Sequence, residues 1–82
     1  MNSKYNNYDQ FEIVDGLVTK ATYFPAGSII TIECTEYNED FKFKNQVVKW
    51  FDYYLTDNFG RVLEVDEEEL TTLIEKGKIQ SC

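Results

Sequence analysis

Apolar and polar side chains alternate along much of this chain with the two-residue period of a β-strand. The clearest example is 28–35, in which Ile30, Ile32 and Cys34 share one face while threonine and glutamate residues share the other. The same alternation, or a run of β-forming residues, predicts further strands at 11–14, 17–23, 41–44 and 61–65. The pattern therefore predicts a mainly β chain.

The longest predicted strand, 47–55, is rich in aromatic residues, and which of its faces is buried is ambiguous. One face carries Lys49 with four apolar or aromatic side chains, and the other carries Asp52 with three. A β-bulge near Asp52 would allow both faces to contribute to the core.

Turn-forming residues separate these strands. Asp15-Gly16 and Thr56–Gly60 predict turns, and Asn45-Gln46 is a candidate tight turn. Residues 36–40, Glu-Tyr-Asn-Glu-Asp, are expected to form an acidic loop.

The hydrophobic period changes from strand to helix near the C-terminus. Apolar residues there follow the helical spacing i, i+3, i+4: Leu70, Leu73 and Ile74. Asp66 is a favoured N-cap residue, and Glu69 three positions later completes a capping box. Lys76-Gly77 is typical of a helix end. We therefore predict a helix over about 67–76.

The chain is expected to form one domain. Residues 1–10 are polar and predict a flexible N-terminal tail, and residues 11–82 predict a single β-rich (α+β) domain. The stretch Phe24–Ile32 resembles the diverging turn of SH3-like barrels, and Tyr54–Val62 looks like their distal hairpin. This resemblance implies a small, partly open, SH3-like β-barrel with one short C-terminal helix. The Ala-Leu-Tyr-Asp-Tyr-like box and a second proline are missing, so proline-rich peptide binding is not carried over.

The composition excludes several kinds of chemistry. The 82-residue chain has no histidine, which excludes imidazole bases, Ser–His and Cys–His nucleophile pairs and histidine-ligated metals. It has no glycine-rich phosphate loop and no nucleophile motif. We therefore expect no enzyme, no catalytic residue, no cofactor and no metal site.

The cysteines and the N-terminal residues indicate the cellular compartment in which the protein is expected to act. Cys34 and Cys82 have neither the pattern of a disulfide framework nor metal-ligand spacing, so we expect a buried Cys34 thiol and a frayed terminal Cys82. The first ten residues lack the apolar core of a signal peptide, and no apolar run approaches the roughly 20 residues that span a membrane. The sequence therefore predicts a cytoplasmic protein with no membrane partner.

Acidic residues outnumber basic ones by 15 to 8, which gives a net charge of −7. Such a chain repels phosphate, so direct nucleic-acid binding is not expected even though its aromatic residues could stack on bases. Its field would instead steer it towards basic partners.

The carboxylates gather in two patches, 33–40 and 64–69. Asp66 and Glu69 are explained by helix capping, and the rest could be a solvated strand face or further charge at the helix start. A calcium site is not expected, because no Asp-x-Asp-x-Asp-Gly pattern occurs. The alternative is that the surplus carboxylates contact a partner: Glu33, Glu36, Glu39, Asp40, Glu64, Glu67 and Glu68.

Small size, strong acidity, richness in Asn, Lys and Tyr and the lack of a catalytic motif resemble phage-encoded host-takeover proteins, several of which mimic DNA. The resemblance implies a non-enzymatic inhibitor in the host cytoplasm. It would bind the DNA-binding surface of a basic bacterial protein, for example an HU-type nucleoid protein, with Tyr37 or Phe59 as an aromatic anchor at the rim. The alternative is an SH3-like interaction module that binds through strand 47–55. The first hypothesis requires the two acidic patches to share one surface.

Overall fold

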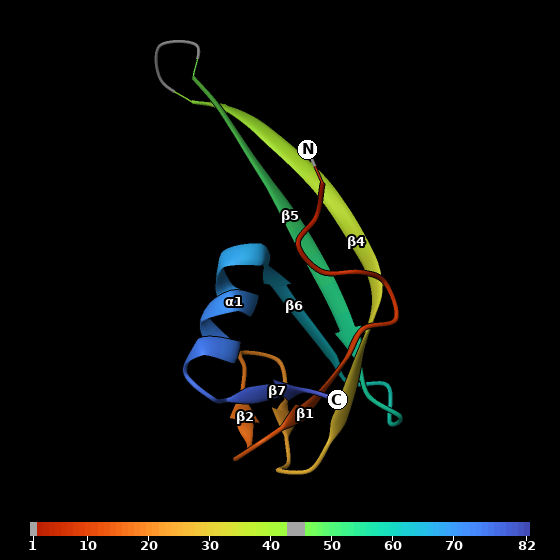
Figure 1. Cartoon of the computed structure of the whole chain (residues 1–82). Helices are drawn as coiled ribbons and strands as arrows, with labels where there is room; N and C mark the ends of the chain where they lie inside the picture. The colour runs from red at the N-terminus through yellow and green to blue at the C-terminus, as the bar shows by residue number, and fades with distance from the viewer. Residues whose placement is uncertain (1, 43–45) are drawn as a thin grey trace.

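Seven β-strands and one α-helix follow one another in the computed structural model, which describes residues 2–42 and 46–82 (Figure 1). Their bounds are β1 Gln10–Ile13, β2 Leu17–Val18, β3 Tyr23–Phe24, β4 Ile29–Lys42, β5 Gln46–Thr56, β6 Val62–Asp66, α1 Glu67–Glu75 and β7 Ile79–Ser81. The prediction of a mainly β domain with one short C-terminal helix is therefore confirmed. No helix in these described ranges has the length and apolar content needed to cross a lipid bilayer.

The strands form two antiparallel sheets. The larger has the order β6-β5-β4-β1-β7, and β2 pairs with β3 in a separate small hairpin. In the described part of the chain, β6 and β7 lie at opposite edges, so the sheets do not close into a barrel. The connection between these two edges is α1, which contacts β5, β6 and β7 and so covers one face of the sheet (Figure 1).

The hairpin of β4 and β5 is much longer than the rest of the sheet. β1 pairs only with 29–31 of β4, and β6 pairs only with 52–56 of β5. Beyond these pairings, 37–42 and 46–51 extend past the other strands as a two-stranded ribbon, which we call the projecting ribbon (Figure 1). The ribbon makes the molecule elongated, with principal extents of 44 × 23 × 23 Å.

The prediction that 36–40 form an acidic loop is wrong, because these residues belong to β4. Glu36 pairs with Asp52 and Asp40 pairs with Val48, so β5 supplies the partners that a strand needs. Charge and polarity at these positions predict exposure but do not prevent strand pairing. The predicted strand end at 43–44 and most of the predicted Asn45-Gln46 turn lie outside the described residues, and Gln46 begins β5.

A β-bulge reverses the facing of β4 in its middle. The register shifts between Ile32 and Cys34, so the bulge lies at Glu33, whereas the sequence had suggested Asp52 as a place where a bulge would reconcile the two faces of 47–55. Beyond Glu33, Thr35 therefore replaces Cys34 on the inner face. As a result Cys34 is exposed, which corrects the prediction of a buried thiol; Cys82 is exposed as well.

The core lies between α1 and the inner face of the sheet. Its largest fully buried side chains are Tyr53, Phe24, Ile13, Ile30, Ile32, Leu55, Leu70 and Ile79. The predicted capping box is confirmed: the N–H of Glu69 donates to the Asp66 carboxylate over 2.7 Å, and the N–H of Asp66 donates to the Glu69 carboxylate over 3.1 Å. Leu70 then faces the core from the first turn of α1.

The N-terminal segment, predicted to be a flexible tail, packs against the domain. The ring of Tyr5 meets those of Tyr53 and Phe11 edge to face, with centroids 5.5 and 6.2 Å apart. The Tyr5 hydroxyl lies 2.7 Å from that of Thr71 in α1. The N–H of Tyr8 donates to the C=O of Ile32 over 2.7 Å. Residues 2–9 therefore cover the part of the core that α1 leaves open.

Candidate functional site

The sheet has an inner face towards α1 and an outer face on the opposite side. Phe51, Tyr53 and Leu55 are buried at alternate positions of β5, so they define the inner face. The residues between them, such as Asp52, therefore lie on the outer face. Because paired residues share a face in an antiparallel sheet, the register carries this assignment onto β4 and β6.

Carboxylates from all three strands gather on the outer face, and we call this surface the acidic face: Glu36, Asp40, Asp52, Glu64 and Asp66. Glu36 pairs directly with Asp52, which in turn pairs with Asp66. Side chains at such positions have Cβ atoms about 4.5–5.5 Å apart. Three strands thus place a continuous row of three carboxylates across the sheet, with Glu64 in the neighbouring row.

Neutral hydrogen-bond donors hold this row in place. The Tyr54 hydroxyl donates to Glu36 Oε2 over 3.2 Å. Asn38 Nδ2 donates to Asp52 Oδ2 over 2.8 Å. Outer-face positions within 34–40, 48–54 and 62–66 hold no lysine or arginine. The negative charge of the acidic face is therefore oriented but not neutralised there.

The crowding of carboxylates affects their titration. Burial raises the pKa of Asp52, the negative charges of Glu64, Asp66 and Glu36 raise it further, and the Trp50 side chain partly opposes the rise. Burial, together with Glu36 and Glu64, raises the pKa of Tyr54 to about 12, so this phenol remains a neutral donor at neutral pH. Repulsion within the acidic face is thus retained in the free protein, and a cationic partner would relieve it.

Replacing Asp52 with asparagine should stabilise the free protein at neutral pH. The pKa of Asp52 is raised on folding, so its contribution favours the fold below the unfolded pKa and is lost as the pH rises through the folded value. We expect Asp52→Asn to increase the free energy of unfolding at pH 7 by less than about 1 kcal/mol, because Asp52 is only half-buried.

Urea unfolding at pH 7 and at about pH 3 measures this effect, and the difference between the two proteins should vanish at the lower pH. Asn38→Ala is a matched control that removes the hydrogen bond to Asp52 but leaves the charge. A destabilised Asp52→Asn protein at pH 7 would contradict the prediction.

The structure separates the seven predicted contact carboxylates. Glu36, Asp40 and Glu64 lie together on the acidic face, and Glu33 is exposed at the bulge. Glu39 lies on the inner face of the projecting ribbon, where it pairs with Lys49. The two predicted patches therefore share one face in part.

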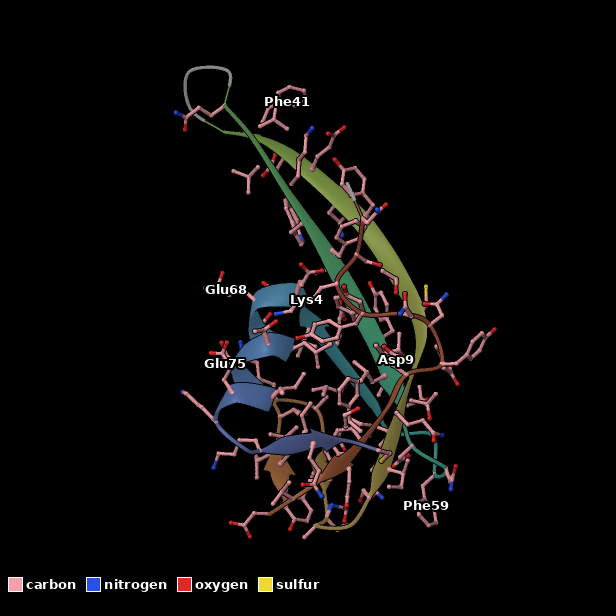
Figure 2. All side chains as sticks on the ribbon, in the orientation of Figure 1. Lys4, Asp9, Phe41, Phe59, Glu68 and Glu75 are labelled. Carbon is pink, nitrogen blue, oxygen red and sulfur yellow. The ribbon has the colours of Figure 1, made fainter. Side chains whose placement is uncertain are left out.

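The two remaining predicted contacts lie on α1. Glu67 accepts hydrogen bonds from the Tyr53 hydroxyl over 2.6 Å and from the N–H of Lys4 over 3.0 Å, so it ties the N-terminal segment and the sheet to the helix. Burial and the bond to Glu67 raise the pKa of Tyr53 to about 12. Glu68 is exposed and points away from the sheet (Figure 2).

Sequence reasoning missed two members of the acidic face, Asp52 and Asp66. The sequence explains Asp66 by helix capping alone, whereas its pairing with Asp52 is what brings it to the outer face. Asp52 was placed in an aromatic strand of ambiguous facing. Asp52 faces outward because its neighbours Phe51, Tyr53 and Leu55 face the core, and only the folded structure shows that these three are buried.

No group of three or more Cys, Asp or Glu side chains in 2–42 and 46–82 is arranged to hold a metal ion. Arg61 lies in the turn after β5, where it forms an ion pair with Asp57. Burial alone would raise the pKa of Asp57, but hydrogen bonds from Arg61 and from the N–H of Phe59 hold it below its usual value. Arg61 is therefore committed to the turn and not to the acidic face.

Comparisons with known proteins do not supply a function. None of the protein-family models, curated proteins or solved structures compared with this chain matches it. The function is therefore inferred from the surfaces of the molecule.

The projecting ribbon is a second candidate surface, because it exposes several large apolar side chains. Phe41 is 74% exposed near its far end (Figure 2), and Tyr37, Val47 and Val48 are exposed along it. By contrast Phe51 is buried in the core, as are the next two inner-face residues of β5. The aromatic strand that was considered as a binding surface therefore contributes mainly to the core, and only its ribbon half and its outer face are accessible.

Proposed function

We propose that this protein is a non-enzymatic inhibitor that binds the DNA-binding surface of a basic host protein and excludes DNA by mimicry. The carboxylate row of Glu36, Asp52 and Asp66 carries the proposal. It supports mimicry because a rigid sheet holds like charges at fixed positions that side chains on a mobile segment would not maintain.

The spacing of the acidic face suits a partner that binds a phosphate backbone. Neighbouring strands are about 4.8 Å apart, and same-face residues along one strand repeat at about 6.6 Å. The face thus presents an array of negative charge in two directions, on a chain with a net charge of −7. A DNA-binding surface lined with lysine and arginine offers complementary charge, and the association would be fast and sensitive to salt.

An HU-type nucleoid protein is a concrete candidate partner, because such a protein binds DNA without base-specific contacts. A phage-encoded inhibitor of this kind would act in the cytoplasm of its bacterial host. Tyr37, one of the two expected aromatic anchors, pairs with Phe51 on the inner face and so lies opposite the acidic face. The ring of Phe59 lies in the turn after β5, where the Arg61 guanidinium stands over it, 5.1 Å from the ring centroid.

A displacement assay tests the proposal. A fluorescent DNA duplex bound to a purified HU-type protein should be released as this chain is added, and the release should weaken steeply when the salt concentration is raised. Bovine serum albumin, also acidic, controls for nonspecific charge competition. Formation of a ternary complex with DNA, or no change in DNA binding at low salt, would count against mimicry of this partner.

The exposed apolar side chains of the projecting ribbon favour a second candidate function. A two-stranded ribbon is only marginally stable by itself, so exposed Phe41 and Val47, which pair on its inner face, are typical of a surface that a partner covers. This chain would then be a protein-interaction module of the SH3-like kind, binding through the first half of strand 47–55. Binding that persists at high salt and is unaffected by DNA would favour the module over the mimic.

A further inference from the structure

The edge strand β6 borders a groove in the described part of the chain. The groove has a volume of about 1390 Å³ and lies between β6, α1 and the β2–β3 hairpin. Its floor is apolar, because Leu63 and Val65 of β6 meet Leu17 and Leu73, which pack against the core from the hairpin and the helix. It is therefore an apolar channel with a strand edge along one side.

The direction of the backbone groups on β6 follows from the turn that precedes it. The N–H of Asp57 donates to the C=O of Arg61 over 3.1 Å, so these two residues form a hydrogen-bonded pair. Hydrogen-bonded and non-hydrogen-bonded pairs alternate along an antiparallel ladder. Val62 and Glu64 are therefore at positions whose N–H and C=O groups point away from β5, along the groove.

Asp66, two residues after Glu64, confirms the outward direction of the backbone groups at alternate positions of β6. The N–H of Asp66 donates to the side chain of Glu69 and not to β5. In the part of the chain that the structure describes, β5 is the only strand paired with β6. The edge thus offers two N–H and two C=O groups, at Val62 and Glu64, to an added strand.

Charge is distributed unevenly around the groove. Asp66, Glu68 and Glu69 line the end where α1 begins, and Lys76 and Lys78 line the end where it finishes. Lys20 lines the hairpin side, and Glu64 points to the outer face beside the edge. An extended segment in the groove would therefore meet negative charge at one end and positive charge at the other.

We propose that the β6 edge binds an extended, basic segment of a partner protein, which pairs antiparallel to β6 as a sixth strand of the sheet. Side chains at alternate positions of this segment are lysine or arginine and face Glu64 and Asp66. The intervening side chains are apolar and enter the groove against Leu17 and Leu73. The antiparallel direction puts the amino-terminal half of the segment beside Asp66 and its carboxyl-terminal half towards the lysines.

This proposal is independent of DNA mimicry, since a strand-adding segment need not belong to a DNA-binding protein. It uses the backbone of β6, whereas mimicry uses the side chains of the acidic face. A peptide therefore tests it without the intact partner. The probe is an end-blocked hexapeptide of alternating lysine and valine, added to the full ¹⁵N-labelled chain and followed by NMR.

We expect the peptide to shift the amide signals of Val62 and Glu64 and to slow the hydrogen exchange of these two amides by about tenfold or more. A peptide with N-methyl groups on alternate amides should lose the effect, because it cannot complete the ladder. A peptide with glutamate in place of lysine should also bind more weakly, because Glu64 and Asp66 would repel it.

A pair of variants separates the edge from nonspecific charge attraction. Val62→Pro removes one outward N–H and places a ring on the edge, and we expect it to weaken peptide binding about tenfold or more. Val62→Thr keeps the N–H and should bind like the unmodified chain. Val62→Pro should still displace DNA from a basic protein, so failure of the edge and failure of mimicry are distinguishable.

Three outcomes would overturn the proposal: equal binding of the N-methylated peptide, equal binding by Val62→Pro and Val62→Thr, or no shift at millimolar peptide. Shifts confined to Glu36, Asp40 and Asp52 would also overturn it, because they would assign the peptide to the acidic face. If Val62→Pro proves unfolded by circular dichroism, the N-methylated peptide alone decides.

Discussion

Reversing the charge of Glu36, Asp40 and Glu64 to lysine is expected to weaken binding of a basic, DNA-binding partner by about a hundredfold or more. Close charge pairs across an interface contribute roughly 1.5–7 kcal/mol each, and three reversals would replace attraction with repulsion. All three side chains are exposed, so the fold should tolerate the change. Isothermal titration or surface plasmon resonance at low and high salt measures the effect.

A matched control makes the same change in net charge elsewhere. Glu39, Glu68 and Glu75 are exposed and lie on the inner face of the ribbon or on α1, where Figure 2 shows Glu68 and Glu75 on the helix. Their reversal to lysine should weaken binding only severalfold, through the long-range field. Equal losses in the two triple variants would contradict a role for the acidic face and would indicate a general effect of net charge.

Replacing Leu70 with alanine is expected to cost about 2–5 kcal/mol of unfolding free energy. Leu70 is fully buried and anchors the first turn of α1 to the sheet beside Val65, which precedes the helix cap. Because a domain of this size is stabilised by only a few kcal/mol, the variant should be partly unfolded at 37 °C. Urea denaturation followed by Trp50 fluorescence measures the change.

Val18→Ala is the control, because Val18 is 77% exposed and its truncation should change the free energy of unfolding by less than about 0.5 kcal/mol. A loss below about 1 kcal/mol for Leu70→Ala would mean that α1 does not contribute to the core as the structure describes.

Local features of the fold could be predicted from the sequence, and features that depend on register could not. The helix and its capping box were correct because Asp66, Glu69 and Leu70 act within one turn of chain. The predicted facing of β4 is wrong beyond Ile32, because a single-residue bulge moves every later side chain to the opposite face. Nothing in the local sequence pattern indicates this bulge.

The candidate site, too, could be predicted from the sequence only in part. Its acidic character was predictable, and three of its five members, Glu36, Asp40 and Glu64, were among the predicted contacts. Asp52 and Asp66 were missed because each joins the acidic face only through its cross-strand partners. The open edge of β6 was not predictable either, since an edge exists only once the strand order is known.

By itself, the sequence determined that this chain is acidic, lacks imidazole chemistry and consists mainly of strands with one capped helix. These properties depend on composition or on contacts within a few residues. Only the tertiary structure decided that Glu36, Asp52 and Asp66 form one row, that Cys34 is exposed and that β6 has a free edge. The physical reason is that side chains in a sheet alternate with a period of two, so the bulge at Glu33 and the pairing of distant strands decide which charges share a face.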